Sequence, residues 1–271
     1  MPELPEVETT RNGISQHILG AIVDEVIIRQ NKLRWPVTRN LRQVLKQQTL
    51  HSIDRRAKYL LLKYDSGTLI IHLGMSGSLR ILPTDTAPEK HDHIDIIFNN
   101  QKLLRYHDPR RFGAVLWTSQ AIDKHKLIAA LGPEPLEDEF NTQHLQETCQ
   151  NKKVAIKNHI MNQATVVGVG NIYASEALYM SGIRPGRAAG KITRTEQSLL
   201  VSNIKIVLDR AIQQGGTTLK DFTNSDGKPG YFKQSLHVYG RDGQCCSSCK
   251  SIIKKVVIGQ RSSFYCPKCQ K

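Results

Sequence analysis

The amino terminus of the chain holds residues that can do covalent chemistry. The sequence opens MPELPEVETT, so Pro2 directly follows Met1 and two carboxylates stand close by, at Glu3 and Glu6. If Met1 is removed, the terminal group is the secondary amine of the Pro2 ring, which can attack an electrophilic carbon. The glutamates also suit an ordinary helix start, because carboxylates there interact favourably with the helix dipole. The residues alone leave both interpretations open.

A second group of reactive residues lies at the other end of the chain. Five of the six cysteines lie from residue 245 onward, and only Cys149 lies elsewhere. Four of them have the spacing C-x2-C-x16-C-x2-C, which is typical of a four-thiolate zinc site: Cys246, Cys249, Cys266 and Cys269. Four thiolates leave no open coordination position, so we expect one structural Zn²⁺, with Cys245 as a bystander. The stretch between the cysteine pairs predicts a β-hairpin that presents Arg261 at its tip towards a phosphate.

A third pattern predicts an anion site at the start of a helix. In VVGVGNIYASEAL, Gly168 and Gly170 precede Asn171, which we expect to be the N-cap. Exposed N–H groups at a helix start bind phosphate oxygens, although a lone GxG is more often an ordinary turn. Three lysines precede this segment and strengthen the prediction: Lys152, Lys153 and Lys157. We therefore expect Lys157 and Asn171 to contact DNA.

Charge and composition point to the same class of partner. The 38 Lys and Arg residues outnumber the 24 Asp and Glu residues, which gives a net charge of +14. The partner that this charge favours is a nucleic-acid backbone, and an anionic membrane surface comes second. A third interpretation is that the charge serves solubility alone. No apolar run approaches the ~18 residues of a membrane span, and acids stand where a signal peptide has a basic flank. We expect a cytoplasmic protein.

The elements that must position these residues differ between the two halves. Residues 2–19 predict a helix that stops at Gly20, and its prolines predict a terminus that projects from the body. Short β-rich runs follow to about residue 118 and predict an antiparallel sandwich or barrel: AIVDEVIIR, KYLLLKY, TLIIHL, HIDIIF, KLLRYH and GAVLWT. GPEPLEDEF, at residues 132–140, reads as a linker. Beyond it the periodicity is helical, most clearly in EQSLLVSNIKIVLDRAIQQGG, where Gly215 and Gly216 end the helix.

Over essentially its whole length the chain resembles the formamidopyrimidine-DNA glycosylase family. The resemblance rests on the four-cysteine tail and on these segments: MPELPEVET, RRAKYLLL, HLGMSGSLR, KHDHID, DPRRFG, LGPEPL, VVGVGNIYASE, QGGTTLKDF, SDGKPGYF and VYGR. It implies an α+β fold of two parts. The N-terminal part is an antiparallel β-sandwich with a leading helix, and the C-terminal part is helical, with a helix-two-turn-helix and a zinc-finger hairpin. The resemblance implies that DNA is held between the two parts. We expect four segments: a catalytic domain at 1–131, a linker at 132–140, a helical domain with a lesion-capping loop at 141–236, and a zinc finger at 237–271.

The resemblance also implies a reaction and assigns the terminal residues to it. Members of this family carry out base excision repair: they remove 8-oxoguanine and formamidopyrimidines from duplex DNA and then cleave the abasic site by β,δ-elimination. By this resemblance Pro2 attacks C1′ and forms an iminium (Schiff base) link, Glu3 is the general acid at the sugar ring oxygen, and Glu6 orients the terminus. Lys58 matches the lysine of β-elimination. Arg261 matches the arginine linked to δ-elimination, where we favour electrostatic clamping of phosphate over proton transfer.

The remaining matched residues concern DNA. Met75, Arg111 and Phe112 match the residues that fill the gap left by a flipped base, and Arg111 can hydrogen-bond the orphaned cytosine. Further matches are backbone contacts at His91, Arg110 and Lys152, and a loop at residues 217–231 that closes over the flipped base. The family further implies a monomer that works at the bacterial nucleoid.

Two other readings compete with this one. Endonuclease VIII shares the chemistry of Pro2 and Glu3 but prefers oxidised pyrimidines, and Leu4, the RRF segment and the loop at 217–231 favour the purine enzyme over it. A non-catalytic zinc-ribbon protein would explain the basic tail. It gives no reason for the combination of Pro2, Glu3 and Lys58.

Overall fold

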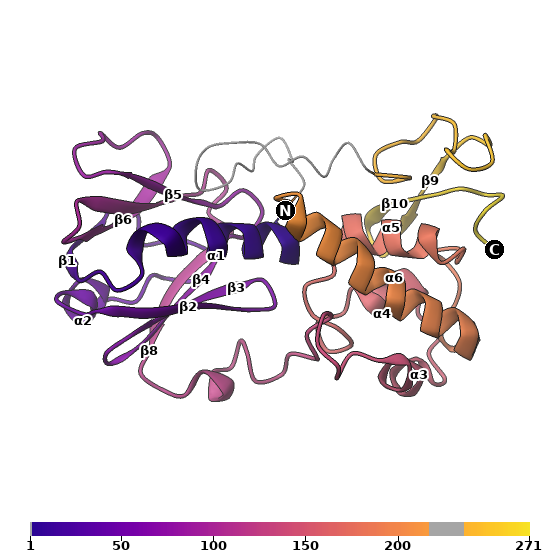
Figure 1. The fold of residues 1–271 in the computed structure, drawn as a ribbon, viewed down its shortest axis with the longest axis horizontal. Coiled ribbons are helices and arrows are strands. Elements are labelled where there is room, and N and C mark those ends of the chain that lie inside the picture. Colours follow the sequence, from indigo (N-terminus) through magenta and orange to yellow (C-terminus); the bar gives the residue numbers. More distant parts are fainter. Residues whose placement is uncertain (1, 217–235) are drawn as a thin grey trace. The chain divides into compact units, whose positions relative to one another are not determined.

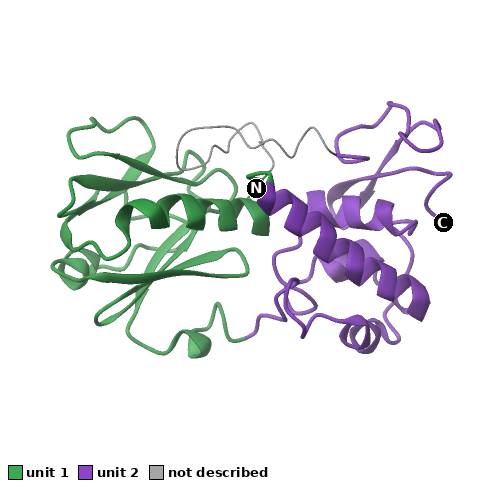
Figure 2. Ribbon diagram, viewed as in Figure 1, with its two compact units in different colours: residues 1–129, 214–231 green, residues 130–213, 232–271 purple. Residues whose placement is uncertain are grey.

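The computed structural model of the chain describes residues 2–216 and 236–271 (Figure 1). The predicted loop at residues 217–231 lies outside this part. The described residues form two compact units, one of residues 2–129 with 214–216 and one of residues 130–213 with 236–271 (Figure 2). Among the described helices, none combines the length and the apolar character that crossing a membrane requires.

The first unit begins with helix α1, Leu4–Ile18. Gly20 follows it with a φ of +78°, a left-handed conformation that suits glycine and ends the helix where the sequence predicts. The expectation that the terminus projects from the body is wrong, because Pro2 is buried and Glu3 is only 2% exposed.

Two four-stranded antiparallel sheets make up the rest of this unit. One has the order β1-β6-β7-β5 and the other the order β2-β3-β4-β8. The strands of the first sheet are β1 (Val23–Ile28), β5 (Ser78–Pro83), β6 (Asp92–Phe98) and β7 (Lys102–His107). The strands of the second sheet are β2 (Leu50–Arg56), β3 (Tyr59–Tyr64), β4 (Gly67–His72) and β8 (Ala114–Thr118). Two short helical segments complete the unit: α2 (Leu41–Leu45) and η1 (Ile122–Lys124).

One hydrophobic core joins α1 to both sheets. It includes Ile14 of α1, Leu62 of β3 and Ile96 of β6, all buried. α1 contacts strands of both sheets and runs along the sandwich in Figure 1. The predicted antiparallel sandwich with a leading helix is confirmed.

The second unit is built around a buried helix. Its helices are α3 (Thr142–Cys149), α4 (Ile156–Ile160), α5 (Asn171–Met180), η2 (Ala189–Lys191) and α6 (Arg194–Gln213). Every residue of α5 from Ile172 to Tyr179 is buried, including Glu176, whose Oε1 accepts from the backbone N–H groups of Val238 and Tyr239. α6 is amphipathic, and the face predicted to be apolar is buried, including Leu200, Ile204 and Leu208.

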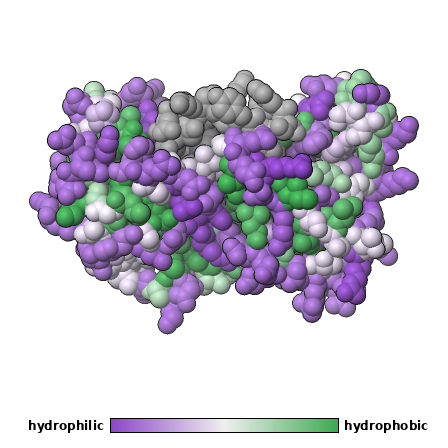
Figure 3. All heavy atoms as spheres, viewed as in Figure 1, coloured by the Kyte–Doolittle hydropathy of each residue, from purple (hydrophilic) through white to green (hydrophobic). Residues whose placement is uncertain are grey.

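The chain ends in a two-stranded hairpin of β9 (Lys254–Ile258) and β10 (Arg261–Tyr265). Its turn is Gly259–Gln260, and both residues have positive φ, which matches the twist of a two-residue hairpin turn. The hairpin predicted between the cysteine pairs is therefore confirmed. On the face seen in Figure 3, hydrophilic residues predominate over both units, in keeping with the charge of the chain.

Candidate active site and nucleic-acid interface

The start of α1 gathers the residues predicted to react. Glu3 is the N-cap, and the backbone N–H of Glu3 donates to Oε2 of Glu6 at 2.8 Å. The side chain of Glu3 accepts in turn from the backbone of Glu6, which completes a capping box. Glu6 is fully buried, and a Cβ added to Gly216 would lie 3.2 Å from Oε1 of Glu6. The two carboxylates are thus held in fixed positions beside Pro2.

Lys58 lies in the two-residue turn between β2 and β3. The turn begins at Ala57, whose φ is +54°, and Lys58 is only 7% exposed. Lys58 also affects His72, at the end of β4. The pKa of His72 is lowered to about 4, mainly by burial and next by the positive charge of Lys58. His72 is therefore neutral at physiological pH.

An ion pair that was not predicted from the sequence links this turn to α1. Nε of Arg55 donates to Oε2 of Glu8 at 2.7 Å, while Nη1 of Arg55 donates to the carbonyl of Ala57 at 3.0 Å. Burial raises the pKa of Glu8, but hydrogen bonds from Arg11 and Arg55 outweigh it and the net pKa is lowered. Glu8 is thus ionised and links the helix that carries Glu3 to the turn that carries Lys58.

The two loops with the predicted gap-filling residues lie against each other. A Cβ on Gly74 would meet the backbone of Phe112 and Gly113 at 2.5 Å, so the loops touch where no side chain intervenes. Met75 and Phe112 are unusually exposed for their types, at 38% and 46%. Arg111, which directly precedes Phe112, has a φ of +55°. The structure thus brings the three predicted residues onto one pair of loops.

His91 and Arg110 belong to the same region. His91 is partly exposed, has a φ of +76°, and its carbonyl accepts the backbone N–H of Asp108 at 3.1 Å. The guanidinium of Arg110 lies 5.0 Å from the centre of the Phe112 ring, a cation–π distance. The sequence interpretation did not single out Asp108, whose contacts are described below.

The four tail cysteines form a metal site. Their sulfur atoms all lie within 4.8 Å of one another, and Cys245 is not part of the group. Zn–S bonds of about 2.3 Å in a tetrahedron place sulfurs roughly 3.8 Å apart. The Sγ atoms of Cys246 and Cys269 are 3.9 Å apart, and those of Cys249 and Cys266 are 3.3 Å apart. The site fits one structural zinc ion.

Within the second unit, Lys157 points to the hairpin of β9 and β10. It is fully buried, and its ammonium donates to Oδ1 of Asn171 at 2.5 Å, to Oγ of Ser263 at 2.6 Å and to the carbonyl of Ser262 at 3.1 Å. The Nδ2 group of Asn171 also donates to Ser262, at 3.0 Å. Lys157 and Asn171 therefore hold the hairpin of β9 and β10, which we call the zinc hairpin, against the start of α5.

The prediction that Asn171 is an N-cap is wrong, whereas Arg261 lies next to the hairpin turn, in agreement with its predicted place at the tip. The predicted N-cap, Asn171, is instead the first residue of α5, and Gly170 is the N-cap. The side-chain amide of Asn171 bonds with Lys157 and Ser262. Arg261 begins β10 directly after the turn and is exposed. A Cβ on Gly259 in that turn would meet Asn158 at 2.3 Å, so the turn packs closely on α4. Lys152 is exposed.

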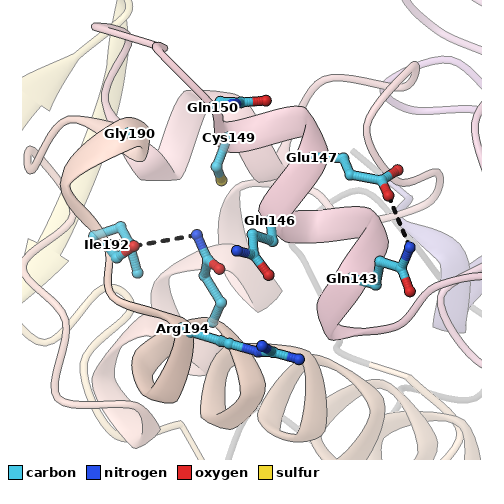
Figure 4. A pocket seen from close by; sticks show the side chains of 9 residues that line it. Gln143, Gln146, Glu147, Cys149, Gln150, Gly190, Ile192 and Arg194 are labelled. Carbon is cyan, nitrogen blue, oxygen red and sulfur yellow. Dashed lines mark hydrogen bonds between the residues drawn. The ribbon is translucent and has the colours of Figure 1, made fainter.

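A hollow of about 490 Å³ lies elsewhere in the second unit (Figure 4). Its lining includes Cys149, whose thiol pKa burial raises to about 11, so it is not a thiolate at neutral pH. Nε2 of Gln197 donates to the carbonyl of Ile192 at 3.1 Å, which is one of the dashed lines in Figure 4. None of the predicted site residues lines this hollow.

Three family models match the chain in succession. They are the formamidopyrimidine-DNA glycosylase N-terminal domain over residues 1–115, the formamidopyrimidine-DNA glycosylase H2TH domain over 131–223, and the zinc finger found in FPG and IleRS over 243–271. The formamidopyrimidine-DNA glycosylase of Hydrogenovibrio crunogenus is 57% identical over 271 residues, which is 100% of this chain and 97% of that protein.

Solved structures of Lactococcus lactis Fpg have the same fold. A mutant of that protein in complex with DNA that contains Fapy-dG is 31% identical with a TM-score of 0.92, and the match covers 100% of both chains. The wild-type protein in complex with DNA that contains an oxidised pyrimidine is 32% identical with a TM-score of 0.92, again over 100% of both chains. Matches of this extent establish that the chain belongs to the formamidopyrimidine-DNA glycosylase family.

Proposed function

We propose that this protein is a DNA repair enzyme that excises oxidised purines, such as 8-oxoguanine and formamidopyrimidines, from duplex DNA and then cleaves the abasic strand. The observation that carries the proposal is full-length identity above one half with a formamidopyrimidine-DNA glycosylase. The capping box that holds Glu3 and Glu6 beside Pro2 supports it.

In the proposed reaction the nitrogen of Pro2, freed by removal of Met1, attacks C1′ of the damaged nucleotide. The bond from C1′ to the base breaks, and the base leaves with the electron pair of that bond. The attacking nitrogen loses its N–H proton, which the departing base takes up, and the nitrogen so regains a lone pair. The bond from C1′ to the ring oxygen then breaks, Glu3 donates a proton to that oxygen, and the lone pair closes the iminium. Glu6, bonded to the N–H of Glu3 at 2.8 Å, keeps the terminus in place.

Strand cleavage needs two eliminations. Loss of a proton from C2′ expels the 3′ phosphate, and loss of a proton from C4′ then expels the 5′ phosphate. We assign Lys58 to β-elimination, since the ion pair of Glu8 and Arg55 keeps its turn against α1. Arg261, exposed at the hairpin turn, clamps phosphate and promotes departure in the δ-elimination step. The zinc ion supplies no chemistry, because four thiolates complete its coordination.

For lesion access we assign Met75, Arg111 and Phe112 to the gap left by the flipped base, and Lys152, His91 and Arg110 to backbone contacts. Lys157 and Asn171 are assigned to holding the zinc hairpin, because the ammonium of Lys157 is buried against that hairpin. For domain organisation we keep a catalytic domain at 1–131, a linker at 132–140, a helical domain at 141–236 and a zinc finger at 237–271. We further propose that the protein is a monomer at the nucleoid in the cytoplasm, which light scattering at working concentrations tests in part.

Borohydride trapping tests the central proposal. The protein is incubated with a duplex that carries 8-oxoguanine opposite cytosine, reduced, and run on a denaturing gel. We expect a covalent band with a C-terminally tagged protein and none with an N-terminally tagged one, because the tag blocks the amine of Pro2. If the damaged duplex is bound but neither trapped nor cut, the protein is a non-catalytic DNA binder.

A relative has been solved in complex with DNA that contains an oxidised pyrimidine, so oxidised pyrimidines are tested as a second class of substrate. A duplex with thymine glycol is run in parallel. Trapping on the 8-oxoguanine duplex at the higher rate supports the purine enzyme, and trapping on thymine glycol alone supports an enzyme of the endonuclease VIII type.

A further inference from the structure

Asp108 is a fully buried carboxylate that the proposed chemistry does not use. It directly follows β7 and accepts hydrogen bonds at both of its oxygens. Oδ1 accepts from Oγ of Ser76 at 2.8 Å and from the backbone N–H of Arg110 at 3.3 Å. Oδ2 accepts from the backbone N–H of Gly113 at 2.9 Å and from the hydroxyl of Tyr106 at 3.0 Å. The side chain thus joins the loop of Met75 to the loop of Phe112.

The backbone of Asp108 adds a third loop to this junction. Its N–H donates to the carbonyl of His91 at 3.1 Å. Its carbonyl lies 2.8 Å from Nε2 of His93, which must therefore carry the proton, and it also accepts the N–H of Arg111 at 3.2 Å. The loops around Met75, His91 and Arg111 are therefore all tied to one residue.

The chemistry of this position requires a carboxylate. Each oxygen of Asp108 accepts from one backbone N–H, and a backbone N–H cannot reverse its role as donor. An asparagine would turn its NH₂ group against the N–H of Gly113 in one orientation and against the N–H of Arg110 in the other. The N–H of Arg110 is shared between Oδ1 of Asp108 and Oγ of Ser76, each at 3.3 Å. Asparagine therefore matches the shape of aspartate but loses one of its two bonds from backbone N–H groups in either orientation.

Close packing makes the loops sensitive to that loss. A Cβ on Gly113 would lie 1.8 Å from the hydroxyl of Tyr106, and one on Gly74 would lie 2.5 Å from the backbone of Gly113. Met75 and Phe112 are exposed directly beside these close glycine contacts. A change in the hydrogen bonds of Asp108 would therefore disturb backbone that is already closely packed.

We infer that Asp108 is a positioning residue that holds Met75, Arg111 and Phe112 in the arrangement that fills the duplex once the damaged base is flipped out. The inference rests on the proposed function. It concerns the step that extrudes the base and reads the opposite base, whereas attack by Pro2 on an abasic sugar that is already extruded does not need this arrangement.

The test compares Asp108→Asn with Asp95→Asn. Asp95 is a matched control, because it is a carboxylate of the same sheet that is also buried but pairs with Arg29 and Arg105 instead of the loops. Three duplexes are used: 8-oxoguanine opposite cytosine, 8-oxoguanine opposite adenine, and a preformed abasic site opposite cytosine. Single-turnover excision and borohydride trapping are measured, with melting temperature as the measure of folding.

For Asp108→Asn we expect excision opposite cytosine to fall about tenfold or more, since a rigidly placed acceptor is lost. The preference for cytosine over adenine opposite 8-oxoguanine should shrink. Trapping on the abasic duplex should stay within about threefold of wild type, a smaller effect than the tenfold change, or ~1.4 kcal/mol, expected for excision. Asp95→Asn should lower the melting temperature but leave the cytosine preference as it is. A smaller loss of the same kind is expected for Ser76→Ala, which removes one donor to Asp108 and serves if Asp108→Asn does not fold.

Equal losses of excision and trapping in both aspartate variants, with an unchanged cytosine preference, would overturn the inference and leave Asp108 as a purely structural carboxylate. An unchanged cytosine preference in Ser76→Ala and Asp108→Asn alike would do the same. Failure of the proposed function looks different, because the wild-type protein itself would then fail to excise 8-oxoguanine opposite cytosine.

Discussion

Replacement of Lys157 by methionine separates a buried clamp from a DNA contact. Hydrogen bonds of the ammonium include those to Asn171, Ser263 and Ser262, and the side chain has no exposed area. At about 1.5–3 kcal/mol each, three bonds from a charged donor amount to roughly 5–9 kcal/mol. The effective desolvation cost of a buried ammonium, several kcal/mol, offsets most of that. We expect a net loss of about 2–4 kcal/mol, or a fall in melting temperature of about 5–15 °C.

Two lysine variants provide the controls and the assay. Lys153→Met removes an exposed lysine nearby and should leave the melting temperature within about 2 °C of wild type. Lys152→Met should reduce the slope of log affinity against log salt by about one, as loss of a phosphate contact does. Lys157→Met should leave that slope unchanged. An unaltered melting temperature together with a slope reduced by one in Lys157→Met would refute the argument from burial.

Three further predictions concern metal, pH and packing. Metal analysis should find one zinc ion per chain. Cys266→Ser should abolish zinc binding and weaken DNA binding, because the hairpin that carries Arg261 depends on the zinc site. A hydrogen bond from Arg187, opposed by burial, lowers the pKa of Glu196 to about 2. The stability that this depressed pKa contributes is present above the unfolded value near 4.5 and is lost as pH falls towards 2, so the melting temperatures of wild type and Glu196→Gln should converge over that range. Gly113→Ala should destabilise the protein by about 1–3 kcal/mol through overlap with Tyr106, whereas Gly186→Ala, whose nearest neighbour would be 3.7 Å away, should not.

Features that depend on local spacing could be predicted from the sequence. The cysteine pairs, the hairpin between them and the first helix with its stop at Gly20 each involve residues close in the chain. Local patterns failed where a strand carries few apolar residues. β2 has the sequence LHSIDRR, with only two buried positions, and it was missed because its partner β3 supplies most of the apolar surface.

Features that depend on distant contacts could not be predicted. Asp108 bonds to Ser76 across 32 positions of sequence, and Arg55 bonds to Glu8 across 47. Lys157 looked like a member of a basic surface cluster because Lys152 and Lys153 are close by. Only the fold shows that it points to Ser263, 106 positions away, and is buried. The charge of a lysine is visible in a sequence, whereas the side of the chain that faces solvent is not.

The burial of Pro2 bears on the order of events while the protein is made. A peptidase that removes an initiator methionine needs an extended, accessible terminus, and Pro2 and Glu3 are buried in the folded protein. We therefore expect trimming to come first, while the nascent chain is still emerging from the ribosome, and folding to follow. A chain that folds with Met1 in place would keep its capping box and its zinc site. It would be a stable, DNA-binding protein without a nucleophile.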